Sequence, residues 1–340
     1  MQGGSGNQSP SHWGHRLSFL VAALGLLMIV AGATVTTTRA GDADPEWNFQ
    51  FWRWFPPISQ MNGNLFYEHL HREIGTLLGF AVLALALVLW RTESRSWVRK
   101  LGFLAVLLVC LQGALGGLRV LVVSDPGIQE AATQVTGTAG NVGPARIAFA
   151  MTHATLAQAF FSLLVVLALV TSRFWIGLGA PTKSVAVSKM RRLALITTGL
   201  VFVQLLLGTF VRHSGGGVHL HLTIGLIVVV HLVLLARRAL LNHPDVIPVR
   251  TVATVLGFLG LVQMGLGFAS WGFLMGRTEM DLRTPGVASA LFRSSHVALG
   301  ALVLAGCVSL VLLAYRFMVD QDASEGANPE SSSLEEVSVT

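Results

Sequence analysis

The sequence predicts an all-α integral membrane protein in which eight transmembrane helices form two pseudo-symmetric four-helix bundles. Composition gives the class, since the chain is 53% hydrophobic and only 12% charged, about half the charge of an ordinary soluble domain. Eight apolar runs give the number of helices, because about 20 residues at about 1.5 Å per residue cross a hydrocarbon core of about 30 Å. A recurring pattern of histidine, glutamine and glycine indicates the division into two halves.

The apolar runs come in two groups of four. The first half, residues 17–172, is expected to place its spans at 17–38, 67–90, 101–122 and 147–172. The second half, residues 192–317, is expected to place its spans at 192–211, 219–236, 251–272 and 292–317.

The ends of the chain are polar. Residues 1–16 are expected to form a cytoplasmic N-terminal segment. The span that follows is longer than a signal-peptide core and lacks a convincing cleavage site, so we expect it to be retained. Residues 318–340, rich in serine and glutamate, are expected to be a disordered cytoplasmic tail.

Basic residues predict the orientation of the spans. Lysine and arginine gather after the second, fourth and sixth spans, at Arg91, Arg95, Arg99, Lys100, Lys183, Lys189, Arg191, Arg192, Arg237 and Arg238. Short loops of this kind remain on the cytoplasmic side. We therefore expect a multi-pass protein of the cell inner (cytoplasmic) membrane, surrounded by the lipid bilayer, with both termini cytoplasmic. The net charge of +6 is then mostly a topological signal and gives no reason to expect nucleic acid as a partner.

Four histidines stand near the outer start of the even-numbered spans, each followed four residues later by glycine or alanine. They are His71, His153, His221 and His296. An ionisable or metal-ligating side chain inside a membrane is expensive, so its recurrence at one depth indicates a function. A single such histidine can instead be a hydrogen-bond donor between helices, and we assign that kind of packing role to His231.

The odd-numbered spans carry a matching pattern. Gln112, Gln204 and Gln263 are each followed four residues later by a glycine, and three odd spans end in Arg39, Arg119 and Arg212. His71 and His221 are 150 residues apart, and His153 and His296 are 143 apart. The two offsets support an internal duplication in which each half contributes one histidine pair.

Two imidazoles on opposing helices can bind a haem iron from both faces, so the sequence predicts two haem sites. Haem propionates need cations at the membrane boundary, and guanidinium suits a carboxylate well. Arg39, Arg72, Arg119 and Arg212 stand at about that level. Each of these arginines is equally well explained by snorkelling to the interface.

Glu68 precedes His71 by three residues and shares its helix face. A carboxylate beside a haem can accept or deliver a proton, although an acid in the first turn of a helix also stabilises the helix dipole. His219 is the main competitor for a ligand position, since it lies two residues before His221.

These residues also carry a family resemblance. Glu68-His69-Leu70-His71-Arg72 matches the E-x-x-H-R motif of the haem A synthase family, and further segments resemble that family in order and spacing. They are Gln112 to Arg119, His153 to Ala157, Gly208 to His213, the His296 segment, and Asp44-Pro45-Glu46-Trp47, which resembles a Cys-Pro-Asp-Trp stretch.

The resemblance implies an oxidoreductase of haem biosynthesis and cytochrome oxidase assembly that converts the C8 methyl group of haem O to the formyl group of haem A. It implies that His221 and His296 ligate a haem b cofactor, that His71, His153 and Arg72 address the substrate haem, and that Glu68 is catalytic. A haem O synthase, an electron acceptor and a second copy of the chain are candidate partners.

The chain departs from the family at its cysteines. The family often has cysteine pairs in outer loops, whereas Cys110 and Cys307 both lie in apolar spans, and Asp44 stands where a loop cysteine is expected. The main alternative is a bis-histidine membrane cytochrome b for quinone-linked electron transfer. A haem transporter is disfavoured because the spans lack interior breaks.

Overall fold

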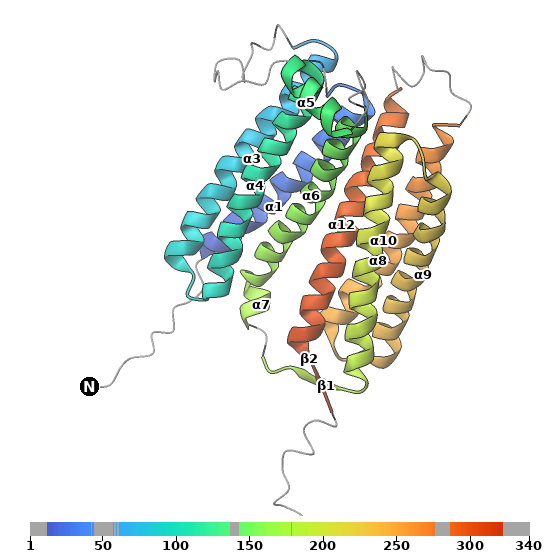
Figure 1. Cartoon of the computed structure of the whole chain (residues 1–340). Helices are drawn as coiled ribbons and strands as arrows, with labels where there is room; N and C mark the ends of the chain where they lie inside the picture. The colour runs from blue at the N-terminus through green and yellow to red at the C-terminus, as the bar shows by residue number, and fades with distance from the viewer. Residues whose placement is uncertain are drawn as a thin grey trace, which may run out of the picture.

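The computed structural model describes residues 12–41, 43, 57, 59, 61–136, 143–177, 179–275 and 286–321. Eight of its helices are long and apolar enough to cross a membrane, which confirms the predicted fold class within this part of the chain (Figure 1). They are α1 (His12–Thr37), α3 (Asn64–Thr92), α4 (Ser96–Ser124), α6 (Gly143–Val170), α8 (Val187–Ser214), α9 (Val218–Asn242), α10 (Ile247–Gly272) and α12 (Val287–Phe317).

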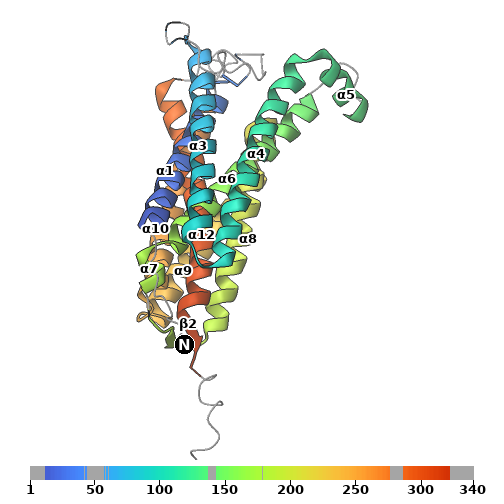
Figure 2. The ribbon, with the colours of Figure 1, turned by 90° about the vertical axis from the view of Figure 1, so that its left-hand side faces the viewer.

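The long helices contact one another in two rings. In the first, α1 contacts α3, α3 contacts α4, α4 contacts α6, and α6 returns to α1. In the second, the same sequence of contacts runs through α8, α9, α10 and α12. The rings meet where α12 contacts α1 and α6, and where α6 contacts α8. Figure 2, viewed from the side of the first half, shows α12 behind α3 and α4. The pseudo-symmetry between the two halves stays a prediction.

Each ring encloses an apolar core, and large apolar side chains also cover the outside. Leu85 and Leu164 are fully buried in the first bundle, and Leu235 is fully buried in the second. In contrast, Phe80 and Phe258 are each 65% exposed on the outer surface. Such an exterior suits a hydrocarbon environment and would be a liability in water.

The helices extend several residues beyond the predicted apolar limits, because their polar ends continue the hydrogen-bonded spiral past the hydrocarbon core. Between α8 and α9 the turn is short and depends on glycine. Gly215 has φ 75° and Gly217 has φ 78°, values that residues with a Cβ rarely adopt. This turn brings the end of α8 and the start of α9 to the same level.

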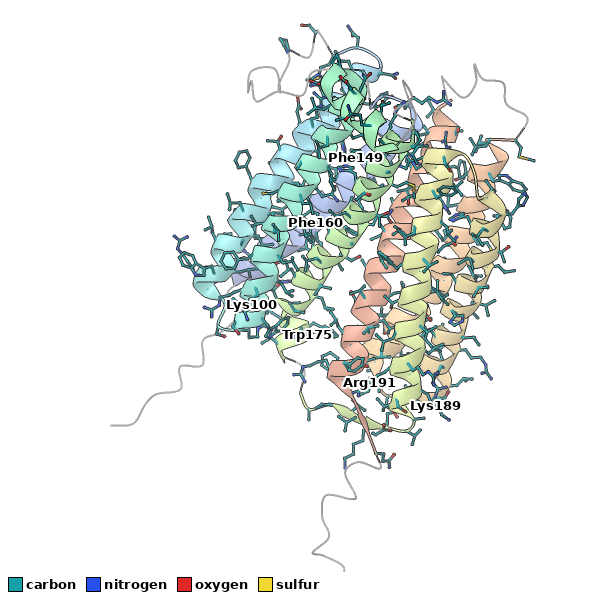
Figure 3. All side chains as sticks on the ribbon, viewed as in Figure 1. Lys100, Phe149, Phe160, Trp175, Lys189 and Arg191 are labelled. Carbon is teal, nitrogen blue, oxygen red and sulfur yellow. The ribbon has the colours of Figure 1, made fainter. Side chains whose placement is uncertain are left out.

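The described part of the chain also holds two short helices that were not predicted. Helix α5 (Pro126–Thr136) contacts α4 and α6, and it caps the end of the first bundle where α4 and α6 meet (Figure 1). Helix α7 (Arg173–Gly177) follows α6. Lys100, Lys189 and Arg191 lie together at the opposite end of the molecule from α5 (Figure 3); the orientation in the membrane stays a prediction.

The prediction of disorder from residue 318 is wrong for its first residues. Met318–Asp320 forms β2, which pairs in parallel with β1 (Thr182–Ser184). Arg191 donates to the Met318 carbonyl at 2.6 Å, and the Val187 N–H donates to Asp320 Oδ1 at 3.4 Å. Pairing with β1, in the linker before α8, thus gives hydrogen-bond partners to backbone N–H and C=O groups that would bind water in a free tail. Residues 1–11 and 322–340 lie outside the described residues.

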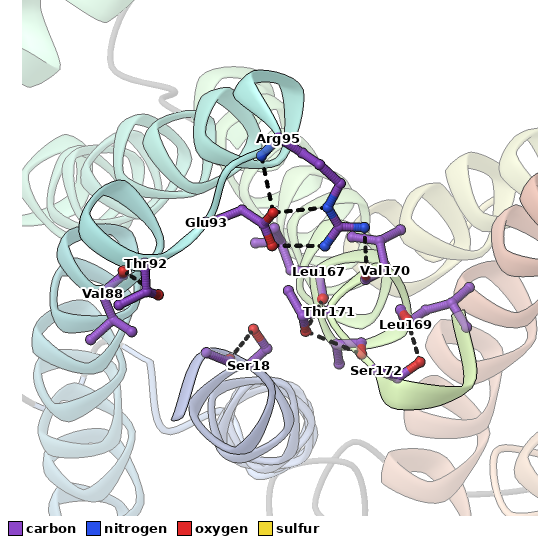
Figure 4. A network of polar contacts seen from close by, with 12 residues as sticks. Ser18, Val88, Thr92, Glu93, Arg95, Leu167, Leu169, Val170, Thr171 and Ser172 are labelled. Carbon is purple, nitrogen blue, oxygen red and sulfur yellow. Dashed lines mark hydrogen bonds and ion pairs between the residues drawn. The ribbon is translucent and has the colours of Figure 1, made fainter. Parts of the chain in front are cut away.

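The turn between α3 and α4 is tied to α6 at the same end. Arg95 pairs with Glu93 at 2.7 Å and also donates to the Val170 carbonyl at 3.0 Å (Figure 4). The hydrogen bond from Arg95 lowers the pKa of Glu93. This contact fixes the first bundle at the end opposite the histidines.

Candidate functional site

All four predicted histidines lie against a glycine of the preceding long helix. A Cβ built on that glycine would come within 3.0 to 3.4 Å of the imidazole Cε1 atom. The pairs are His71 with Gly32, His153 with Gly116, His221 with Gly208, and His296 with Gly267. Each ring therefore occupies space that only glycine leaves open, and we call these four residues the seat glycines.

The histidines of each pair come from helices that are not neighbours in their ring. His221 on α9 and His296 on α12 face each other with ring centroids 6.2 Å apart and ring planes at 80°. An imidazole nitrogen lies about 2 Å from a transition metal that it ligates, so two rings sharing one metal ion have centroids about 6 Å apart. The second pair fits a bis-histidine haem.

In the first pair, His71 on α3 and His153 on α6 interact electrostatically with each other, and both interact with Arg119. The Nδ1 atoms of all four histidines are buried and have no hydrogen-bond partner within the described residues. Burying such a group without a partner is costly, a cost that functional residues in a membrane protein tolerate. Neutral imidazole is a donor type that fits haem iron.

Three glutamines fasten the histidine helices. Gln204 donates to the His221 carbonyl at 2.9 Å, and Gln263 donates to the His296 carbonyl at 2.9 Å. Gln112 donates to the His153 carbonyl at 3.2 Å. The glutamine-glycine repeat in the sequence is therefore one structural device, in which the glutamine bonds the backbone and the glycine receives the ring.

Glu68 is buried, with 3% of its surface exposed. One carboxylate oxygen pairs with Arg72 at 2.6 Å, and the other accepts the Ala43 N–H at 2.8 Å. The two bonds hold the carboxylate in one orientation, about one turn from His71. Arg72 itself interacts electrostatically with His71, so the sequence motif is brought together as expected.

The other predicted arginines differ in their surroundings. Arg119 donates to the Gly41 carbonyl at 3.4 Å, near the first pair. Arg212 donates to Thr37 Oγ1 at 2.7 Å and to the Ala33 carbonyl on α1, while it interacts electrostatically with His296. Arg39 is exposed just beyond α1, at φ 57°.

Sequence reasoning missed several residues near the sites. Arg293 interacts with Arg212 and stands three residues before His296, the spacing that Glu68 has to His71, so the repeat itself could have revealed it. Gly32 lacks the preceding glutamine that marked the other seat glycines. His213 was not predicted as a site residue, yet it interacts electrostatically with Arg119 and His153 of the first pair.

The other histidines considered as ligands, His219 and His231, have different surroundings from the two pairs. His219 is exposed, and His231 contacts Thr197 at 3.4 Å as a packing residue. Cys110 and Cys307 are both free thiols, the first exposed and the second buried. The segment Asp44-Pro45-Glu46-Trp47 lies outside the described residues.

Known proteins resemble this chain over the first bundle and into the second. The family model COX15-CtaA, described as cytochrome oxidase assembly protein, matches residues 15–221, which include His71, His153 and His221. A protein named heme A synthase from Hyphomonas neptunium is 32% identical over 182 residues. That alignment covers 53% of this chain and 42% of the relative, so the chain spans less than half the length of the protein it matches. Because the family model covers more than half of the sequence, the chain belongs to the COX15-CtaA family of cytochrome oxidase assembly proteins.

Proposed function

We propose that this protein is a haem A synthase, which oxidises the C8 methyl group of haem O to a formyl group and so supplies haem A for terminal oxidases. The observation that carries the proposal is the buried Glu68 carboxylate beside the first histidine pair. The name of the Hyphomonas relative supports the same activity. The second pair lacks an acid at the corresponding position, where Val218 and Arg293 stand before His221 and His296.

The first pair is the proposed substrate site. His71 and His153 would ligate the iron of haem O from opposite sides, which fixes the macrocycle across the bundle. Arg72 and Arg119 would attract its propionates, because both interact electrostatically with His71. The outer-level position of these cations would set which edge of the macrocycle faces the boundary.

Glu68 would handle protons at the methyl group. Converting a methyl to a formyl group withdraws electrons and protons and adds one oxygen atom, so it needs an electron acceptor, an oxygen donor and a proton acceptor. A carboxylate held by Arg72 and the Ala43 N–H is positioned without further reorganisation. We propose it as the proton acceptor.

The second pair is the proposed cofactor site, where His221 and His296 would hold haem b. When bound, that haem supplies one-electron transfer. Arg212, which interacts electrostatically with His296, and Arg293, which interacts with Arg212, are the cations that would face its propionates. Haem O is insoluble in water, so direct transfer from a haem O synthase is a further part of the proposal.

The test is co-expression with a haem O synthase in a host that lacks haem A, followed by extraction and mass identification of the haems. We expect haem A or its hydroxymethyl precursor from the wild type, and at least a tenfold loss in Glu68→Gln, given the range for general acid–base catalysis. Glu93→Gln is the matched control, because it breaks a similar arginine pair at the opposite end. Its product level should stay near that of the wild type.

Two outcomes would contradict the proposal. Unchanged product in Glu68→Gln would remove the acid from the chemistry. Unaltered haem O, from folded wild type with a bis-histidine spectrum, would favour the cytochrome b that transfers electrons with quinone.

A further inference from the structure

Three of the four histidine positions share one arrangement, and the fourth departs from it. In α4, α8 and α10 a glutamine stands four residues before the seat glycine, and its side-chain amide donates a hydrogen bond to the histidine carbonyl. In α1 the seat glycine is Gly32, and the residue four before it is Met28.

Met28 occupies the place that glutamine has elsewhere. A Cβ at Gly225 would lie 2.9 Å from Gln204 Nε2, and a Cβ at Gly300 would lie 3.1 Å from Gln263 Nε2. These glycines follow His221 and His296 by four residues. Likewise, a Cβ at Gly75, four residues after His71, would lie 2.9 Å from the Met28 methyl carbon.

The exchange of amide for thioether changes how the helices are joined. When two membrane helices joined by a glutamine N–H and a carbonyl move apart, no water is present to take over the lost hydrogen bond. Separating such helices is therefore costly. A thioether has no hydrogen to donate. Methionine also adapts its shape to changing gaps, so at the place that glutamine has elsewhere no hydrogen bond from residue 28 holds α3 against α1.

We propose that Met28 makes His71 the releasable ligand of the first pair, through which substrate haem enters and product haem leaves. His153, fastened by Gln112, is the anchored ligand of that pair. In the second pair both ligands are fastened, by Gln204 and Gln263, so that site retains its haem. This inference rests on the proposed function, since it takes haem as the ligand of both pairs.

The experiment measures haem release from the purified full-length protein in detergent. The protein, isolated with its resident haem and titrated with haem O, is mixed with excess apomyoglobin as a haem scavenger, and the Soret band is followed. We expect a fast phase from the first pair, absent in His71→Ala, and a slow phase from the second. Met28→Gln should slow the fast phase about tenfold, which corresponds to about 1.4 kcal/mol.

Two further variants make the result decisive. Met28→Leu, which changes shape but adds no donor, should leave the fast phase within about twofold of wild type. Gln204→Met should accelerate the slow phase, which tests the same device where the glutamine is native. The inference would be overturned if Met28→Gln and Met28→Leu both released haem at the wild-type rate. If Met28→Gln does not fold, an unchanged slow phase in Gln204→Met would overturn it instead. A wild type that binds no haem O would overturn the proposed function instead.

Discussion

The imidazole ring of each proposed haem ligand lies against a seat glycine, in space that a larger side chain on the facing helix would fill. The histidines themselves were predictable, because polar residues stand out in apolar spans and their spacing repeats. Gly32 was not found because it lacks the preceding glutamine, whereas Arg293 was missed although the repeat marks its position. Which atoms Arg72 and Arg212 would bind could not be read from spacing, because both side chains are long enough to reach several partners.

Replacing a seat glycine should displace its histidine. In Gly208→Leu the new side chain would meet the His221 ring, since even a Cβ would lie 3.1 Å from its Cε1 atom. We expect an altered or lost bis-histidine absorption spectrum for the second-pair haem. Gly199→Leu on the same helix is the control, because nothing lies within 4 Å of its Cβ position. Identical spectra for both variants would contradict the role of Gly208.

At the scale of elements, the strand pair β1–β2 closes the end opposite the histidines. It was not predicted, because three-residue strands carry too little pattern and their pairing depends on chain segments more than 130 residues apart. Its surroundings include a buried histidine: His243 is 1% exposed, and its Nδ1 lies 2.8 Å from Ser184 Oγ in β1.

This strand pair should weaken in acid. Burial, with a smaller effect of Arg238, lowers the pKa of His243 below 6.5, so an opened state takes up a proton more readily than the closed one. The closed form therefore has its full stability above pH 6.5 and loses stability as the pH falls below that value. Hydrogen exchange of residues 182–184, corrected for intrinsic rates, should increase from pH 7.5 to 5.5. The increase should vanish in His243→Asn, and its persistence there would assign it to another group.

For the whole molecule, the eight helices and their approximate limits followed from apolar length alone. How the two bundles dock did not, because lipid-facing and helix-facing apolar surfaces have similar compositions. The structure shows a cleft of about 460 Å³ between α6, α8 and α12, whose lining is mainly apolar and includes Leu163, Phe202 and Gly199. Near the histidine level, Arg212 supplies a polar contact that crosses between the bundles.

Loss of that contact should loosen the docked halves. Arg212→Gln removes the charged donor to Ala33 and Thr37, and hydrogen bonds to charged groups contribute about 1.5–3 kcal/mol. We expect a lower thermal unfolding temperature in detergent by several degrees. Arg192→Gln, at an exposed position of the same helix, should unfold at the wild-type temperature. Equal temperatures for the two variants would show that Arg212 does not join the bundles.

The parallel pairing of β1 with β2 has one more consequence. Because β1 lies in the linker before α8 and β2 directly follows α12, the chain enters and leaves the second bundle at a single point. The β1–β2 pairing thus joins the two ends of the second bundle. A force applied to the C-terminal end is transmitted to the linker as well as to α12. A protein bound to that end would act on the connection between the two halves.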